Sequence, residues 1–401
     1  AISGEIDLLK GGSNDTDLEV VMGLLKHQLQ LCDRLNSVEQ IDAALAQIVD
    51  IAGARKTARI VLLRYPLRWT IDLKLGRVLE QLEQLQEPSL HDDRGLLYYL
   101  AAAYRGLGRE QRAAATADEA YRLPTTSPAE RYSVARAMYD LGCVDWGERE
   151  YRYVIANASV TDLSAALARN DLSMWLHDRE DHEGAADALG QLCLSLEENK
   201  ATKRQLIKTL DEELGGGGGI EYLNKLYARW QFYLAHHQKS LGQHDSQRAS
   251  LLKAARYYQR DPDVLIEMYH ADGADDEFRQ KTATLLDSVN RYHRALIDEY
   301  PDMPFVYNQW AWLVANTEGD FQQAVRYSHK SLELAPEEPS YLDTLGRCYY
   351  SAGDLANAVK YQRRAVKLQP HMQVMRRQLQ LFERELAQEE ASDPETSAEG
   401  E

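Results

Sequence analysis

Residues 319–336, GDFQQAVRYSHKSLELAP, are echoed 34 positions later by residues 353–370, GDLANAVKYQRRAVKLQP. Gly-Asp, Ala-Val, Tyr, Leu and Pro recur at the same offsets in the two stretches. A Gly-Asp pair suits the turn between two helices, a small Ala lets helices approach closely, and Pro cannot continue a helix. A fixed period of this length is typical of stacked supersecondary units. The pattern therefore predicts two consecutive helical hairpins at this end of the chain.

The composition extends the helical prediction to the rest of the 401 residues. Strong helix formers dominate, only 11 prolines are present, and no stretch shows the strict alternation of apolar and polar residues that a half-buried strand needs. A chain of this length holds either several compact domains or one elongated array in which each unit packs on its neighbours. The repeat favours the array, so we expect an all-α, right-handed α-solenoid of helix-turn-helix repeats.

The repeated unit resembles the tetratricopeptide-repeat (TPR) family. In the unit that begins at Pro339, the family's marked positions are occupied by Leu342, Leu345-Gly346, Tyr349, Ala358, Ala365 and Pro370, with the aromatic one place early at Tyr361. The unit that begins at Phe305 keeps Ala324 and Pro336, but it carries Ala311-Trp312 where Leu-Gly is expected. This resemblance implies a superhelix whose first helices line a concave, partner-binding face.

Weaker units lie upstream. Gly108 and Gly142 are again 34 residues apart, and they close the first helices of units beginning near Arg94 and Pro128. Further units are indicated near Ala166 and Ala228, at irregular spacing. The predicted organisation is a short N-terminal stretch (1–14), N-terminal helices or degenerate repeats (15–93), TPR-like repeats (94–214), a glycine linker (215–219), a TPR-like unit with atypical helices (220–304), two clear TPR units and a C-terminal helix (305–388), and a disordered acidic tail (389–401).

Two segments stand apart from the helical pattern. The five glycines at 215–219 predict a flexible tether, which is either a native linker or an engineered replacement of a disordered loop. Residues 1–14 join an acidic and apolar stretch, AISGEIDLLK, to linker residues. This stretch is either a tethered ligand peptide or an ordinary terminus.

The net charge and the cysteine positions argue against nucleic-acid binding, lipid binding and cysteine metal sites. The net charge of -17 disfavours attraction to nucleic acid or to anionic lipid. The four cysteines are far apart, without the paired spacing of metal sites, and are predicted to be buried thiols. No apolar run is long enough to span a membrane and no secretory signal is visible, so we expect a soluble protein, with a cytoplasmic location slightly favoured over a periplasmic one.

No catalytic motif is visible, and the sequence therefore predicts neither an enzyme nor a cofactor. Residues 177–182, HDREDH, place two imidazoles near carboxylates, but they fall at a predicted turn where solvated polar residues are expected. His236 and His237 are consecutive and point in different directions on a helix. No metal site is predicted.

The resemblance also implies which side chains face a ligand, because the family's concave positions recur at fixed offsets in each first helix. Those offsets predict partner contacts at Tyr98, Tyr99, Arg105, Tyr132, Arg136, Tyr139, Asn170, Met174, His177, Phe232, Tyr233, His236, Lys239, Arg347 and Tyr350. Tyr and Arg are enriched where interfaces concentrate binding energy. The Lys and Asn pattern with which some family members clamp a C-terminal carboxylate is not visible.

The sequence thus predicts a non-catalytic scaffold or adaptor that binds a peptide segment of a partner protein in a concave groove. Basic groove residues in an acidic molecule favour a segment with carboxylates and apolar anchors, of the type found at Gly4 to Lys10. Two alternatives stay open: a helical assembly subunit, and an enzyme-associated protein whose pocket is built from the atypical helices. The oligomeric state is not predicted.

Overall fold

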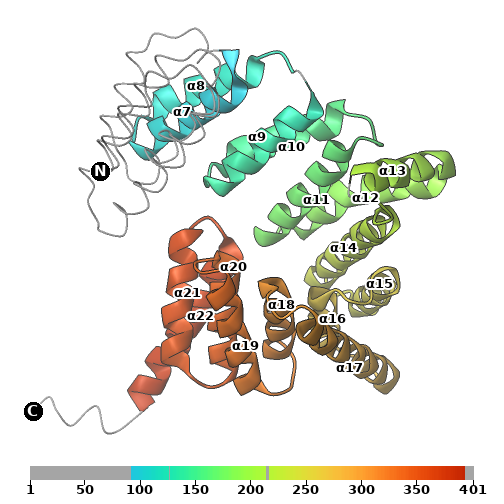
Figure 1. Ribbon diagram of the computed structural model, residues 1–401, viewed down its shortest axis with the longest axis vertical. Helices are drawn as coiled ribbons and strands as arrows, with labels where there is room; N and C mark the ends of the chain where they lie inside the picture. The colour runs from blue at the N-terminus through green and yellow to red at the C-terminus, as the bar shows by residue number, and fades with distance from the viewer. Residues whose placement is uncertain (1–91, 126, 214–215, 393–401) are drawn as a thin grey trace, which may run out of the picture. The chain divides into compact units, whose positions relative to one another are not determined.

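The computed structural model describes residues 92–125, 127–213 and 216–392, and the segments 1–14 and 389–401 singled out above lie wholly or largely outside them. Every regular element in the described part is a helix, which confirms the all-α solenoid of helical hairpins (Figure 1). The chain divides into two compact units, a first unit up to Glu150 and a second unit from Tyr151 onward.

In the first unit the described helices form two hairpins. They are α7 (Arg94–Gly106), α8 (Glu110–Arg122), α9 (Pro128–Asp140) and α10 (Val144–Asn157), the last of which continues into the second unit. The hairpins turn at Gly108 and Gly142, whose φ angles of 73° and 71° favour glycine. Gly147 of α10 packs so closely on α9 that an added Cβ would lie 2.9 Å from the carbonyl oxygen of Ala135.

The second unit stacks twelve further helices, each packed on its neighbours (Figure 1). Those of its first half are α11 (Leu163–Asp178), α12 (His182–Glu198), α13 (Lys200–Glu213), α14 (Gly219–Ser240), α15 (His244–Tyr257) and α16 (Pro262–Tyr269). Those of its second half are α17 (Asp276–Glu299), α18 (Pro304–Ala315), α19 (Phe321–Leu334), α20 (Pro339–Ser351), α21 (Leu355–Leu368) and α22 (Gln373–Ser392).

The 34-residue repeat has the structural consequences that its residues predict. Asp320 and Asp354 cap α19 and α21 by accepting hydrogen bonds from the backbone N–H groups of Gln323 (2.8 Å) and Asn357 (3.0 Å). Both helices end before their prolines. The core between the two hairpins is apolar and closely packed, and its buried members include Val306, Trp310, Ala311, Ala324 and Leu345.

The glycine run is a short connection between α13 and α14. Gly216 and Gly217 have φ angles of 94° and 86°, whereas Gly219 already begins α14. The N–H of Gly219 donates to the carboxylate of Asp211 at 2.7 Å, which ties this connection back to α13.

One contact joins the two ends of the second unit. Asp178 at the end of α11 is buried, and its carboxylate accepts hydrogen bonds from the backbone N–H groups of Gln373 (2.9 Å) and Val374 (2.8 Å). Arg377 donates to the carbonyl oxygen of Asp178 at 2.9 Å. A side chain from the first hairpin of the unit thus caps its last helix, α22. No helix in the described part of the chain is long and apolar enough to cross a membrane.

Candidate functional site

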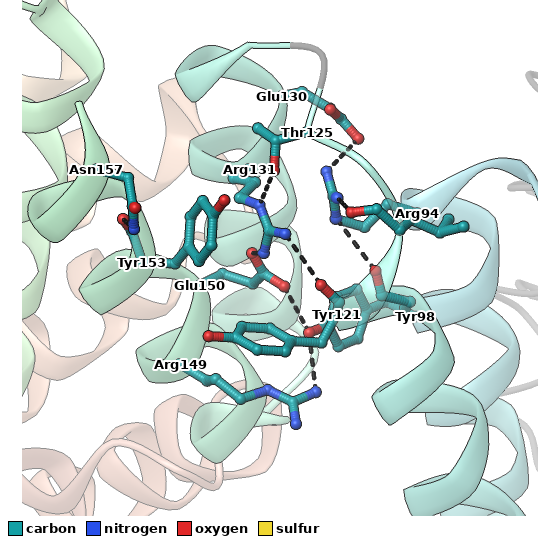
Figure 2. A network of polar contacts seen from close by, with 12 residues as sticks. Arg94, Tyr98, Tyr121, Thr125, Glu130, Arg131, Arg149, Glu150, Tyr153 and Asn157 are labelled. Atoms are coloured by element: carbon teal, nitrogen blue, oxygen red, sulfur yellow. Dashed lines mark hydrogen bonds and ion pairs between the residues drawn. The ribbon is translucent and has the colours of Figure 1, made fainter.

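Tyr98, one of the predicted contact residues, lies in the interior of the first unit. Tyr98 is fully buried, and its hydroxyl donates to the carboxylate of Glu150 at 2.6 Å (Figure 2). Glu150 also accepts from Arg131 at 2.5 Å, and both residues are almost completely inaccessible to solvent. Burial, followed by the charge of Glu150, raises the pKa of Tyr98 well above its usual range. Tyr98 therefore belongs to the packing of the unit, and the sequence offsets misplace it.

The polar network around Glu150 connects α7, α8, α9 and α10, the helices that the structure describes in the first unit. Arg94 of α7 donates to Glu130 of α9 at 2.6 Å and to the carbonyl oxygen of Leu123 at 2.5 Å (Figure 2). Arg149 pairs with Asp118 of α8 at 2.6 Å. Because each buried charge has a partner of opposite sign, the network holds the hairpins in one register.

The other contact residues predicted in this unit keep some exposure. Arg105 pairs with Asp145 at 2.8 Å, and its guanidinium lies 3.6 Å from the ring centroid of Trp146. Tyr99, Tyr132 and Tyr139 are half-buried and Arg136 is exposed. These residues remain candidates for partner contact.

In the second unit the predicted residues divide in the same way. Phe232 and Tyr233 of α14 are buried among other rings. Met174 is 49% exposed, and Asn170, His177, His236, Lys239, Arg347 and Tyr350 are half-buried. Several have internal partners, because Lys239 pairs with Glu267 at 2.7 Å and Tyr350 donates to Glu385 at 2.8 Å. The offsets thus mix packing residues with accessible ones.

A cavity of about 350 Å³ opens between α14, α17 and the start of α18. Its walls carry three tyrosines, Tyr222, Tyr258 and Tyr292, together with the exposed Phe305. We call it the tyrosine cavity. Asn170 reaches it as the only member of the predicted contact set. Burial raises the pKa of Tyr222 and of Tyr258, so both hydroxyls stay protonated at neutral pH.

Charged groups line the same cavity. Arg229 of α14 pairs with Asp261 at 3.1 Å and with Asp263 at 2.8 Å, and Trp312 donates to Asp263 at 2.9 Å. Burial opposes the charge of Arg229, but the two carboxylates raise its pKa above the usual range. This bridge ties α14, α16 and α18 together, so Arg229 has a structural role.

Arg260 differs from the other cations of the cavity. Lys225 pairs with Glu221 at 2.9 Å, whereas Arg260 forms no ion pair with any residue that the structure describes. Its guanidinium lies 4.0 Å from the ring centroid of Tyr292, and the residue is exposed. His293, also in the wall, is buried, and burial lowers its pKa to about 4, so it is neutral at pH 7. Arg260 is therefore the cation most accessible to a ligand carboxylate.

Sequence reasoning missed most of this cavity. Tyr258, Arg260 and Tyr292 lie at the end of α15, in the loop before α16 and on the atypical helix α17, where no repeat offset applies. The available signal was the unusual number of tyrosines, 23 against 5 phenylalanines, since Tyr suits positions with one apolar and one solvated end. That signal gives no position along the chain.

Comparison with known proteins supports the architecture. The tetratricopeptide-repeat family model matches residues 339–372, which begin at the first residue of α20 and include all of α21. Residues 339–372 are therefore a tetratricopeptide repeat. The match falls on the unit whose residues follow the family pattern most closely.

Similarity to individual proteins is either short or distant. The probable biofilm formation methyltransferase WspC of Pseudomonas putida is 39% identical over 71 residues, which are 18% of this chain and 16% of that protein. The chain thus matches about a sixth of that relative's length. Similar solved structures include the TPR domain of P58(IPK), at 15% identity over 80% of this chain and 97% of that chain, with a TM-score of 0.22. Another is the APC/C hetero-tetramer Cut9-Hcn1, at 14% identity over 96% and 80%, with a TM-score of 0.29.

Proposed function

We propose that this protein is a binding module that holds a peptide segment of a partner protein, with an apolar side chain of that segment in the tyrosine cavity. The observation that carries the proposal is the pairing of aromatic walls with Arg260, a cation that lacks a carboxylate partner within the described residues. Aromatic side chains and Arg are enriched at the centres of interfaces. A volume of about 350 Å³ lies within the range of small ligand pockets.

The charges of the cavity favour an acidic partner segment. Asp261 and Asp263 are already paired with Arg229, and His293 is neutral at pH 7, so Arg260 is left to form a charge-assisted hydrogen bond with an incoming carboxylate. Phe305, 54% exposed at the rim, offers apolar area beside it. A segment that alternates acidic and aliphatic residues, as GEIDLLK does at positions 4–10, has this chemistry.

We further propose that the chain itself is not a catalyst. Burial raises the pKa of Cys143 to about 11 and that of Cys193 to about 12, so neither thiol is a thiolate nucleophile at neutral pH. The buried carboxylates of the first unit are committed to structural arginines. Methyl transfer is attributed to a relative of which this chain matches 16%, and it is not extended to this protein.

The proposal is tested by titrating a labelled peptide, AISGEIDLLK, with the full chain and following fluorescence anisotropy. The acceptor chain carries Ile6→Ser, Leu8→Ser and Leu9→Ser, so its own copy of the segment cannot compete. We expect saturable binding that Arg260→Glu weakens at least about tenfold, because an attraction becomes a repulsion; a tenfold change corresponds to about 1.4 kcal/mol.

Arg326→Glu is the matched control, since Arg326 of α19 is an exposed arginine that does not line the cavity. It should leave the affinity within about twofold. A peptide that does not bind, or one that both charge reversals weaken equally, would contradict the proposed site.

A further inference from the structure

Three histidines from three different helices meet in the second unit. His177 lies near the end of α11, His182 is the first residue of α12, and His236 lies in α14. Glu180, between the first two, has a φ of 66°, and this left-handed turn brings the Nδ1 atoms of His177 and His182 to 3.0 Å. α14 packs on both α11 and α12, which places His236 beside them.

We propose that His177, His182 and His236 bind one first-row divalent transition metal ion of the Zn²⁺ class. One ring nitrogen from each residue lies within 4.8 Å of the others. Tetrahedral Zn²⁺ with Zn–N bonds of about 2.0–2.1 Å needs its ligand nitrogens roughly 3.3 Å apart. The ring nitrogens must therefore approach one another by at most about 1.5 Å.

Burial disfavours the protonated form of the three rings. Burial, reinforced by the neighbouring imidazoles, lowers the pKa of His177 to about 3; burial likewise lowers that of His236 to about 3. Burial also lowers the pKa of His182. A neutral imidazole has the lone pair that a metal requires.

Aromatic rings surround the histidine cluster. Phe232 and Tyr233 pack against His177, with ring centroids 5.3 Å and 5.0 Å away, and fix its orientation. Glu267 lies 3.7 Å from the Nε2 atom of His236, which is longer than a hydrogen bond, and its carboxylate is paired with Lys239 at 2.7 Å. The three residues are only partly buried, so an ion can reach them from solvent. Imidazole ligands select Zn²⁺, Ni²⁺ or Cu²⁺ over Ca²⁺ and Mg²⁺, which require oxygen ligands.

Such an ion would cross-link the α11–α12 hairpin to α14. One of its ligands, His177, directly precedes Asp178, the residue that caps α22. This role is independent of peptide binding in the tyrosine cavity.

The test is isothermal titration of the metal-free, tag-free full chain with ZnCl₂, together with the visible spectrum after addition of Co²⁺. We expect one high-affinity site per chain and the intense d–d bands of four- or five-coordinate Co²⁺. His182→Gln, on a half-buried side chain at a helix start, should weaken Zn²⁺ binding at least about tenfold and abolish the bands. It should also abolish the rise in melting temperature that Zn²⁺ gives the unmodified chain.

His237→Ala is the matched control, because His237 is adjacent to His236 on α14 but outside the cluster. It should retain both the site and the Co²⁺ spectrum. His236→Ala, checked for helical content by circular dichroism, provides a second loss-of-site variant. Absence of stoichiometric Zn²⁺ binding, or equal binding by the His182→Gln and His237→Ala chains, would overturn the proposal.

Discussion

Asp343 illustrates how one buried carboxyl group affects stability. It lies on α20, is 7% exposed, and accepts hydrogen bonds from the side-chain amides of Gln362 (2.5 Å) and Gln378 (3.0 Å). Burial raises its pKa to about 6; the two amides and Arg347 lower the pKa, and Asp178 raises it. The folded protein therefore holds this proton more tightly than the unfolded chain, whose ordinary value is 3.8.

The sign of the pH effect follows. The stabilisation from protonated Asp343 is complete below about pH 4 and is lost as the pH rises to about 6. Asp343→Asn removes this titration. The free energy of unfolding of the variant relative to the unmodified chain should thus increase by about 2–3 kcal/mol between pH 4 and pH 7.5, measured by urea unfolding. Asp302→Asn, at an exposed turn, should show no such change, and a flat difference for Asp343→Asn would contradict this account.

At the scale of elements, the start of α22 depends on a distant residue. Asp178 accepts hydrogen bonds from the N–H groups of Gln373 and Val374. The three residues before α22 are Pro, His and Met, which are not the Ser, Thr, Asp or Asn that commonly cap helices. Asp178→Ala should lower the free energy of unfolding by about 1–2 kcal/mol, because two partly buried N–H groups at the start of α22 lose their acceptor. Chemical unfolding measures it, with exposed Asp187→Ala on α12 as the control. Equal effects of the two substitutions would show that the cap contributes nothing.

The hairpins of the first unit depend on Glu150 in a similar way. Its carboxylate is inaccessible to solvent and serves both Tyr98 and Arg131. Glu150→Ala leaves the buried guanidinium of Arg131 without its counter-charge, and we expect a loss of about 3–5 kcal/mol in the free energy of unfolding. Gln111→Ala, on the exposed face of α8, should cost less than about 0.5 kcal/mol. A loss of similar size in both variants, seen by thermal or urea unfolding, would argue against a structural network.

The same elements show what can be predicted from sequence. The turns at Gly353 and Gly108, the Asp caps and the small residues between helices are local features, so a 34-residue period is enough to predict the hairpins. Tyr98 was misplaced because a buried acid 52 positions away accepts its hydroxyl hydrogen bond. The contact of Asp178 with α22 and the meeting of His236 with the α11–α12 turn depend on how many hairpins intervene, which no local pattern encodes.

At the scale of the molecule, the second unit combines a stack of hairpins with atypical helices that the repeat pattern does not describe. Those helices, chiefly α17, build the tyrosine cavity and carry Tyr292 under the guanidinium of Arg260. We therefore expect partner choice to depend on these atypical helices, while the regular repeats hold the helices in position. Fold alone does not select a partner, because unrelated functions share repeat scaffolds.

The most direct test of this claim is a charge exchange between protein and peptide. Anisotropy titrations would compare the unmodified and Arg260→Glu chains, each with AISGEIDLLK and with the same peptide carrying Asp7→Lys. If the Asp7 carboxylate binds Arg260, each single change weakens binding. The pair that carries both changes then binds at least about tenfold more tightly than either pair that carries one change. Additive losses, with no recovery when both charges are reversed, would contradict peptide recognition at the tyrosine cavity.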